Sequence, residues 1–124
     1  MNDTTLLLRQ IHPSFVQAGR VTSQAFTPTS KDSRQLSTYD GDQISAAGAF
    51  EHYTRQPQCQ SIGVYAVRVD ECRELHLEVK ADPEPYPEHV VIGFGDRTPN
   101  AIKTVAKALR EKAVARGWQH IAGH

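Results

Sequence analysis

The chain has 124 residues, of which 39% are hydrophobic and 23% are charged, and this composition excludes an intrinsically disordered protein. Its 14 basic and 14 acidic side chains cancel, which argues against nucleic-acid binding by overall charge. No apolar run approaches the roughly 20 residues that span a bilayer, and the start of the chain lacks the basic segment of a signal peptide. We therefore expect a single cytoplasmic domain over residues 1–124, with no membrane partner.

Short strands separated by polar loops are predicted for the first part of the chain. The apolar run 6–11 predicts a strand that ends at Pro13, because proline has no amide hydrogen to donate. Residues 21–27 alternate weakly and predict an edge strand, and residues 35–39 predict another strand after a loop over 28–34. The alternative is that this part forms a mostly irregular lobe.

The middle of the chain predicts a helix followed by a buried strand. Ser45 provides a capping hydroxyl for a helix over residues 46–55, in which apolar side chains recur on one face. Residues 61–69 are apolar at successive positions, as is typical of a central strand covered on both faces. A short helical turn is expected to begin at Asp70.

The last part of the chain predicts a loop, a strand and a long helix. Residues 81–88 hold three prolines at alternate positions and predict a stiff extended loop before a strand over 89–94. Thr98 and Pro99 are typical of a helix cap and first helical residue, and Gly117 of a helix end. The pattern predicts an α+β fold, with a mixed or antiparallel sheet of about four to six short strands and the long C-terminal helix packed on one face.

A first candidate site combines His12, Ser14, Arg20 and Ser23. An imidazole titrates near neutral pH, and a guanidinium can bind a phosphate or carboxylate through two hydrogen bonds, so this set suits phosphoryl or nucleotidyl chemistry. We predict His12, Arg20 and Ser23, together with Ser37, as catalytic residues. The alternative is that His12 only bonds a backbone carbonyl at a strand end and that Arg20 is solvated in a turn.

A second candidate site is the hydroxyl-rich loop over residues 27–33, where Lys31 adds a positive charge that can bind an anion. The chain has neither a GxxxxGK[ST] nor a GxGxxG phosphate-binding loop. Alternatively, these residue types only satisfy local backbone groups, as they do in any exposed loop. We predict Lys31 and the later His89 as ligand-binding residues.

A third candidate site consists of Arg9 on the first strand, Ser37 within the segment LSTY and Glu88 before the last strand. This order of an arginine, a serine–threonine strand and a late glutamate resembles the NAD-binding arrangement of ADP-ribosyltransferases, at three separated positions. The resemblance implies that Arg9 binds the diphosphate of NAD and that Glu88 orients the ribose hydroxyl.

A fourth candidate site is a basic helix face. Lys103, Lys107 and Arg110 are four and three residues apart, so they share one side of the long helix and can meet nucleic-acid phosphates. The alternative is the ordinary charged outer face of an amphipathic helix, where basic residues near the end also complement the helix dipole.

The sequence therefore predicts a domain that binds a phosphate-bearing ligand, either a nucleotide or RNA, through the polar segment 12–40, and it leaves open whether the domain is an enzyme. The alternatives are a non-catalytic protein–protein interaction module and an NAD-dependent ADP-ribosyltransferase-like enzyme. No motif identifies a cofactor. No metal site is predicted, because the chain has no HExxH and neither Cys59 nor Cys72 lies in a CxxC pair.

Overall fold

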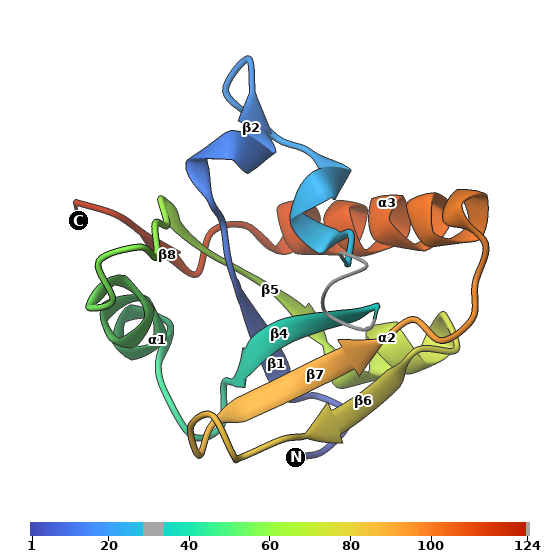
Figure 1. Cartoon of the computed structure of the whole chain (residues 1–124), viewed down its shortest axis with the longest axis horizontal. Coiled ribbons are helices and arrows are strands. Elements are labelled where there is room, and N and C mark those ends of the chain that lie inside the picture. The colour runs from blue at the N-terminus through green and yellow to red at the C-terminus, as the bar shows by residue number, and fades with distance from the viewer. Residues whose placement is uncertain (29–33, 124) are drawn as a thin grey trace.

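The computed structural model describes residues 1–28 and 34–123 (Figure 1). In chain order, its elements are β1 (Leu6–Gln10), the 3-10 helix η1 (Pro13–Phe15), β2 (Val16–Gln17), β3 (Arg20–Val21), the 3-10 helix η2 (Ser23–Phe26), β4 (Gln35–Asp40), α1 (Ala46–Thr54), β5 (Gly63–Arg68), α2 (Val69–Glu74), β6 (Glu78–Ala81), β7 (His89–Gly93), α3 (Pro99–Arg116) and β8 (His120–Ile121).

The main sheet has six strands in the order β6-β7-β4-β1-β5-β8, and every neighbouring pair is antiparallel. The short strands β2 and β3 form a separate hairpin, which projects from the sheet beside η2 (Figure 1). The predicted α+β fold with an antiparallel sheet and a packed C-terminal helix is therefore confirmed.

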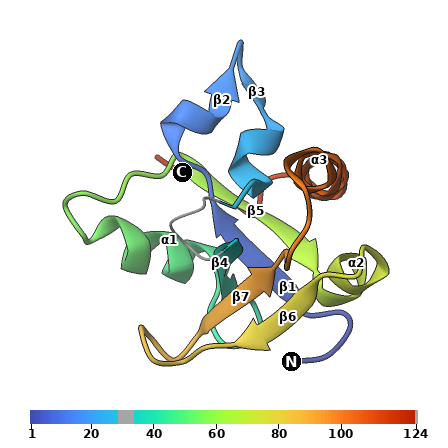
Figure 2. The ribbon, with the colours of Figure 1, turned by 45° about the vertical axis from the view of Figure 1, so that its right-hand side comes forward.

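Each face of the sheet is covered by a helix, as the side view of the ribbon shows (Figure 2). Along β1, alternate side chains enter different clusters: Leu7 packs with α2 and α3, whereas Leu8 packs with α1. The coverage of both faces buries every residue of β5 except Arg68, which explains why apolar side chains fall on both faces of this strand. No helix of the described residues is long and apolar enough to cross a membrane.

The long helix α3 begins and ends where the sequence predicts. The Thr98 hydroxyl accepts a hydrogen bond from the amide of Ala101 at 3.2 Å, and Gly117 terminates the helix with a φ of 93°, in the left-handed region. The chain then returns to the sheet through Trp118, whose ring stacks on Tyr65 at 4.0 Å. The cap of α1 is also confirmed, since the Ser45 hydroxyl accepts from the amide of Gly48.

Three element predictions are wrong. Residues 21–27 do not form an edge strand: only Val21 is in β3, and the 3-10 helix η2 follows and buries Ala25 and Phe26 against the core. The strands β6 and β8 were not predicted. Helix α2 begins two residues earlier than expected, with Arg68 rather than Asp70 at the cap position.

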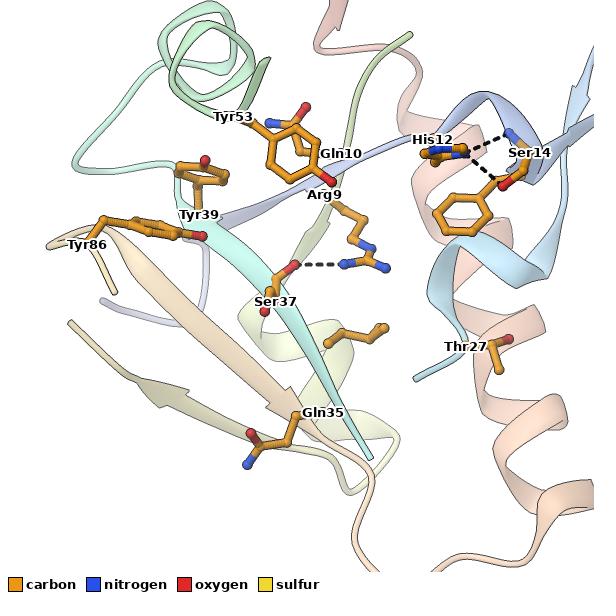
Figure 3. A pocket seen from close by; sticks show the side chains of 12 residues that line it. Arg9, Gln10, His12, Ser14, Thr27, Gln35, Ser37, Tyr39, Tyr53 and Tyr86 are labelled. Atoms are coloured by element: carbon orange, nitrogen blue, oxygen red, sulfur yellow. Dashed lines mark hydrogen bonds between the residues drawn. The ribbon is translucent and has the colours of Figure 1, made fainter. Parts of the chain in front are cut away.

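The feature that creates the candidate site is a split between β1 and β4. These strands pair only at Leu7 with Asp40 and at Leu8 with Tyr39, whereas β4 continues to pair with β7 as far as Gln35. Beyond Leu8 the two strands separate, and the side chain of Arg9 lies between them (Figure 3).

Candidate functional site

A cavity of about 480 Å³ lies at the split between β1 and β4, below helix α1 and the η1 segment (Figure 3). This volume is within the range of roughly 300–1,000 Å³ that is typical of small-molecule sites. Its lining is mostly polar and aromatic, and consists of Arg9, Gln10, His12, Ser14, Phe15, Thr27, Gln35, Leu36, Ser37, Tyr39, Tyr53 and Tyr86.

Gln10 is the most unusual residue of the cavity. Its side chain leaves β1 on the same face as Leu8, and the residue is only 8% exposed. Neither the amide nitrogen nor the amide oxygen of the side chain has a hydrogen-bond partner among the described residues. A buried amide without partners costs about 1–3 kcal/mol, and such groups are rare in folded proteins. Both atoms are also closed to water, so a ligand can pair with this donor and acceptor only if the side chain turns toward the cavity.

Arg9 brings a positive charge to the cavity. Its Nε donates to the carbonyl oxygen of Ala25 at 2.9 Å, and one terminal nitrogen donates to the carbonyl oxygen of Ser37 at 3.0 Å. These bonds hold the guanidinium in the split, next to a strand carbonyl that β1 does not pair. Burial and the nearby Cys59 raise the pKa of the Tyr53 hydroxyl, and the charge of Arg9 opposes that rise.

An aromatic wall faces Arg9 from the side of α1 and the proline-rich loop. The rings of Tyr39 and Tyr86 stack with centroids 4.7 Å apart, and the Tyr39 hydroxyl is hydrogen-bonded to Nδ1 of His52 at 2.8 Å. Burial raises the pKa of Tyr39 to about 12 and also raises that of Tyr86. Both rings are therefore neutral near pH 7 and offer π-faces to the cavity (Figure 3).

Ser37 links the cavity to a buried histidine. The Ser37 side chain is exposed, and its Oγ lies 3.1 Å from Nε2 of His89 on the neighbouring strand β7. Nδ1 of His89 lies 2.9 Å from the carbonyl oxygen of Asp82 and 3.3 Å from its carboxylate oxygen Oδ2. The structure thus aligns a hydroxyl, an imidazole and a carboxylate.

His12 and Ser14 also line the cavity, but they bond to each other. Nδ1 of His12 accepts a hydrogen bond from the Ser14 amide at 3.0 Å, and this bond makes His12 the cap of η1. The same nitrogen lies 2.8 Å from the Ser14 Oγ (Figure 3). The cap explains the histidine before Pro13 by local structure. The alternative interpretation of His12 is a hydrogen bond to a backbone carbonyl. No such bond is found among the described residues.

Two of the predicted catalytic residues lie away from this cavity. Arg20 and Ser23 lie in an open groove of about 530 Å³ beside the β2–β3 hairpin, together with Lys107 and Arg110 of α3. The Arg110 guanidinium donates from Nε to the Val21 carbonyl oxygen at 2.7 Å, which ties α3 to the hairpin.

Three further predicted residues lie outside the cavity lining. Lys103 and Lys107 are exposed on α3, although Lys107 also borders the groove. Glu88 is half-buried near the cavity, where its charge contributes to the raised pKa of Tyr39 after the larger effect of burial. Lys31 lies outside the described residues.

Sequence reasoning missed Gln10, Tyr39, Tyr53 and Tyr86 as members of the site. The sequence does contain a signal for Gln10. It is the polar residue that follows Leu6 and Leu8 on a face of the strand that is otherwise apolar. Tyr53 comes from α1 and Tyr86 from the loop before β7, and only the folded chain brings them to Tyr39 on β4.

In comparisons with known proteins, no family model, no curated protein and no solved structure matches this chain. Within the described part of the chain, no group of three or more histidine, cysteine, aspartate or glutamate side chains could hold a metal ion. The cavity between β1 and β4 is therefore the feature of this chain that bears most on its function.

Proposed function

We propose that this protein binds a nucleotide in the cavity at the split between β1 and β4. The observation that carries the proposal is the carboxamide of Gln10, which is buried in the cavity lining with no partner for either polar atom among the described residues. A ligand that offers one acceptor and one donor side by side removes that cost on binding.

A nucleobase fits this requirement. The edge of adenine offers an acceptor next to an amino donor, and glutamine is a common bidentate partner for it. Tyr39, Tyr53 and Tyr86 provide aromatic faces in the same cavity, and stacking of a base on such a ring contributes about 1–3 kcal/mol. The base is therefore expected to bind between Gln10 and this aromatic wall.

A phosphate fits a second part of the cavity lining. The guanidinium of Arg9 lies beside the backbone of Ser37, and its planar geometry suits phosphate oxygens. Gln10 with the aromatic wall, and Arg9, can thus receive the two parts of a nucleotide, a base and a phosphate, in one cavity of about 480 Å³.

A short nucleotide is favoured over a long RNA strand. Lys107 and Arg110 of α3 line a different groove, and Arg110 is hydrogen-bonded to the hairpin backbone. A single strand that neutralises four protein charges would bind roughly 50-fold more weakly at 200 mM than at 50 mM salt. A mononucleotide that contacts one cation is expected to lose only about threefold over the same range.

The test is a thermal-shift panel of AMP, GMP, CMP, UMP, ATP, NAD, inorganic phosphate and a short RNA, each at 50 and 200 mM salt. A ligand at 100 times its dissociation constant adds about 2.7 kcal/mol of stability, which raises the midpoint by several degrees in a domain of this size. We expect a shift with at least one purine mononucleotide that persists at 200 mM salt.

The control is the double charge reversal Lys103→Glu with Lys107→Glu, which is expected to leave the nucleotide shift unchanged because both side chains lie outside the cavity lining. A shift only with RNA, lost in this variant, would overturn the proposal in favour of the helix face. No shift with any ligand would leave the protein–protein interaction module as the better account.

NAD is a second candidate ligand, because the structure brings two of the three residues of the ADP-ribosyltransferase-like arrangement together. Arg9 bonds the backbone of Ser37 at 3.0 Å, and Glu88 is half-buried near Tyr39. A shift with NAD that exceeds the shift with AMP would favour this reading. Release of nicotinamide, lost in Glu88→Gln, would then identify the activity.

A further inference from the structure

We infer that Ser37 is a nucleophile activated by His89, and that the substrate is a phosphodiester of the nucleotide of the proposed function, whose phosphorus atom Ser37 attacks. The inference rests on the proposed function for its substrate, and on a separate set of contacts for its chemistry. Those contacts join Ser37 in the cavity wall, His89 behind it on β7, and Asp82 beyond the imidazole.

The hydrogen bonds of His89 determine which ring nitrogen carries the proton. The carbonyl oxygen of Asp82 can only accept, so Nδ1 of the imidazole must donate to it over 2.9 Å. In the neutral ring, Nε2 is then the acceptor. Its partner over 3.1 Å is the Ser37 hydroxyl, which therefore donates its proton toward the base. This is the geometry that general-base activation of a serine requires.

The different exposure of Ser37 and His89 suits a reaction in the cavity. Ser37 is exposed, whereas His89 is only 6% exposed, so a substrate can reach the hydroxyl and little water reaches the base. The guanidinium of Arg9 bonds the carbonyl oxygen of the same serine at 3.0 Å. Its positive charge therefore lies at the backbone of the attacking residue, in the same cavity, where it can stabilise negative charge on phosphate oxygens.

The reaction has two balanced steps. Ser37 Oγ forms a bond to phosphorus while the bond from phosphorus to the ester oxygen of the leaving alcohol breaks. The serine proton moves to Nε2 of His89, which passes it to the leaving oxygen. A water molecule then attacks the phosphorus of the intermediate, in which serine and the nucleoside are both esterified to one phosphate; one proton of the water passes through His89 to Oγ, and the phosphorus–Oγ bond breaks. The net reaction is hydrolysis of a nucleotide phosphodiester to a monoester and an alcohol.

Asp82 is a positioning residue in this scheme. Its carboxylate oxygen lies 3.3 Å from Nδ1 of His89, where a negative charge stabilises the imidazolium that forms when the serine proton is transferred. The ring of Tyr86 packs edge-on against the imidazole with centroids 4.9 Å apart and limits its rotation. Since the Asp82 backbone carbonyl also holds Nδ1, removal of the carboxylate alone should leave the tautomer unchanged.

The test uses a fluorophosphonate probe on the full chain, because this reagent transfers a phosphorus group to an activated serine with loss of fluoride. We expect one adduct, located by mass spectrometry on Ser37, and slow hydrolysis of the p-nitrophenyl ester of AMP. Ser37→Ala should abolish both. His89→Gln should slow labelling by at least about 100-fold, which is the scale of general-base catalysis.

Two variants separate catalysis from structure. Ser23→Ala removes a serine of the hairpin groove and is expected to label and hydrolyse at the rate of the unmodified protein. Asp82→Asn should lower the maximal labelling rate less than His89→Gln does, without changing the probe concentration at half-saturation. Nitrogen NMR of His89 should show the Nδ1–H tautomer in both the unmodified protein and Asp82→Asn.

The outcomes distinguish this inference from the proposed function. If nucleotides bind and raise the midpoint but the probe does not label Ser37, the inference is overturned and nucleotide binding remains. Hydrolysis of p-nitrophenyl acetate without hydrolysis of the phosphodiester would also overturn it, because the electrophile would then be a carbonyl carbon. Labelling at Ser37 in a protein that binds no nucleotide would reject the substrate class and with it the inference as stated.

Discussion

Gln10 is the residue on which the functional argument depends most. Folded proteins satisfy nearly all their buried polar groups, so a buried amide with two unpaired atoms needs a physical reason. Pairing with a ligand supplies one: the cost is present in the empty protein and is removed in the complex. An unpaired amide that pairs with a ligand lowers the stability of the unliganded domain and raises the affinity of the domain for that ligand.

This account predicts that Gln10→Met stabilises the unliganded protein. Methionine has a similar length and flexibility but no polar hydrogen, so the unpaired amide disappears while the volume is kept. The free energy of unfolding in urea should rise by about 1–3 kcal/mol, and nucleotide affinity should fall by at least tenfold.

The matched control is Thr38→Val, which removes a buried polar group that is satisfied. The Thr38 hydroxyl donates to the Val90 carbonyl oxygen at 2.8 Å, so its loss should lower the free energy of unfolding by about 1 kcal/mol and leave nucleotide affinity unchanged. If Gln10→Met is destabilised as much as Thr38→Val, Gln10 is an ordinary structural residue.

The edge strand β8 depends on a single close approach. Gly63 of β5 pairs with Ile121, and a Cβ on this glycine would lie 2.5 Å from the His120 carbonyl oxygen and 2.8 Å from the Trp118 ring. Both contacts are shorter than van der Waals distance, and one of them is to backbone. Only glycine allows β8 and Trp118 to pack at this point.

We therefore expect Gly63→Ala to lower the free energy of unfolding by about 1–3 kcal/mol, the usual cost of overpacking. Gly93→Ala on β7 is the control, because a Cβ there would meet the Glu78 Cβ at an ordinary 3.6 Å. That variant should stay within about 0.5 kcal/mol of the unmodified protein in the same urea titration. Equal losses in the two variants would contradict the packing described for β8.

The elements that the sequence predicts well are those with local signals. The limits of α3 follow from Thr98, Pro99 and Gly117, each of which acts within one turn of the helix. By contrast, β6 and β8 are mostly exposed edge strands. Glu78–Ala81 alternates polar and apolar residues over only four positions, and β8 has only two residues, so neither gives a strong local strand signal. Their formation depends on pairing with β7 and β5, which is a long-range property.

The candidate site divides along the same line. Arg9, Ser37 and His89 are predictable as functional residue types, and all three lie on strands that the sequence identifies. That Ser37 and His89 meet depends on the register of β4 against β7, in which Tyr39 pairs with His89. The sequence has no local signal for this register, and it therefore pointed to His12, Arg20 and Ser23, which are close in sequence but do not share one cavity.

Across the whole molecule, all four tyrosine hydroxyls lie in environments that raise their pKa and so disfavour ionisation. Burial is the largest cause in each case, and it raises the pKa above the ordinary value of 10.0, to about 12 for Tyr39. A group with a raised pKa contributes its stability fully below its unfolded pKa. That contribution is lost as the pH rises through the folded pKa.

The domain should therefore lose stability between pH 10 and about pH 12, over the window set by Tyr39. Each tyrosine adds a slope of up to about 1.4 kcal/mol per pH unit in this window. Urea midpoints at pH 9, 10 and 11, with tyrosinate absorbance followed at 295 nm, give the slope, and Tyr39→Phe should reduce it. A stability that is flat from pH 9 to 11 would contradict the burial of these rings.

The most direct test of the central claim is an NMR titration of the isotopically labelled protein with AMP, in which the side-chain amide signal of Gln10 is followed. The signal is assigned by its absence in Gln10→Met. Binding in the cavity predicts a downfield shift of this amide as it gains a hydrogen bond, together with shifts at Ser37 and Tyr39. An unmoved Gln10 amide, with shifts confined to Lys103 and Lys107, would contradict the account and place the ligand on α3.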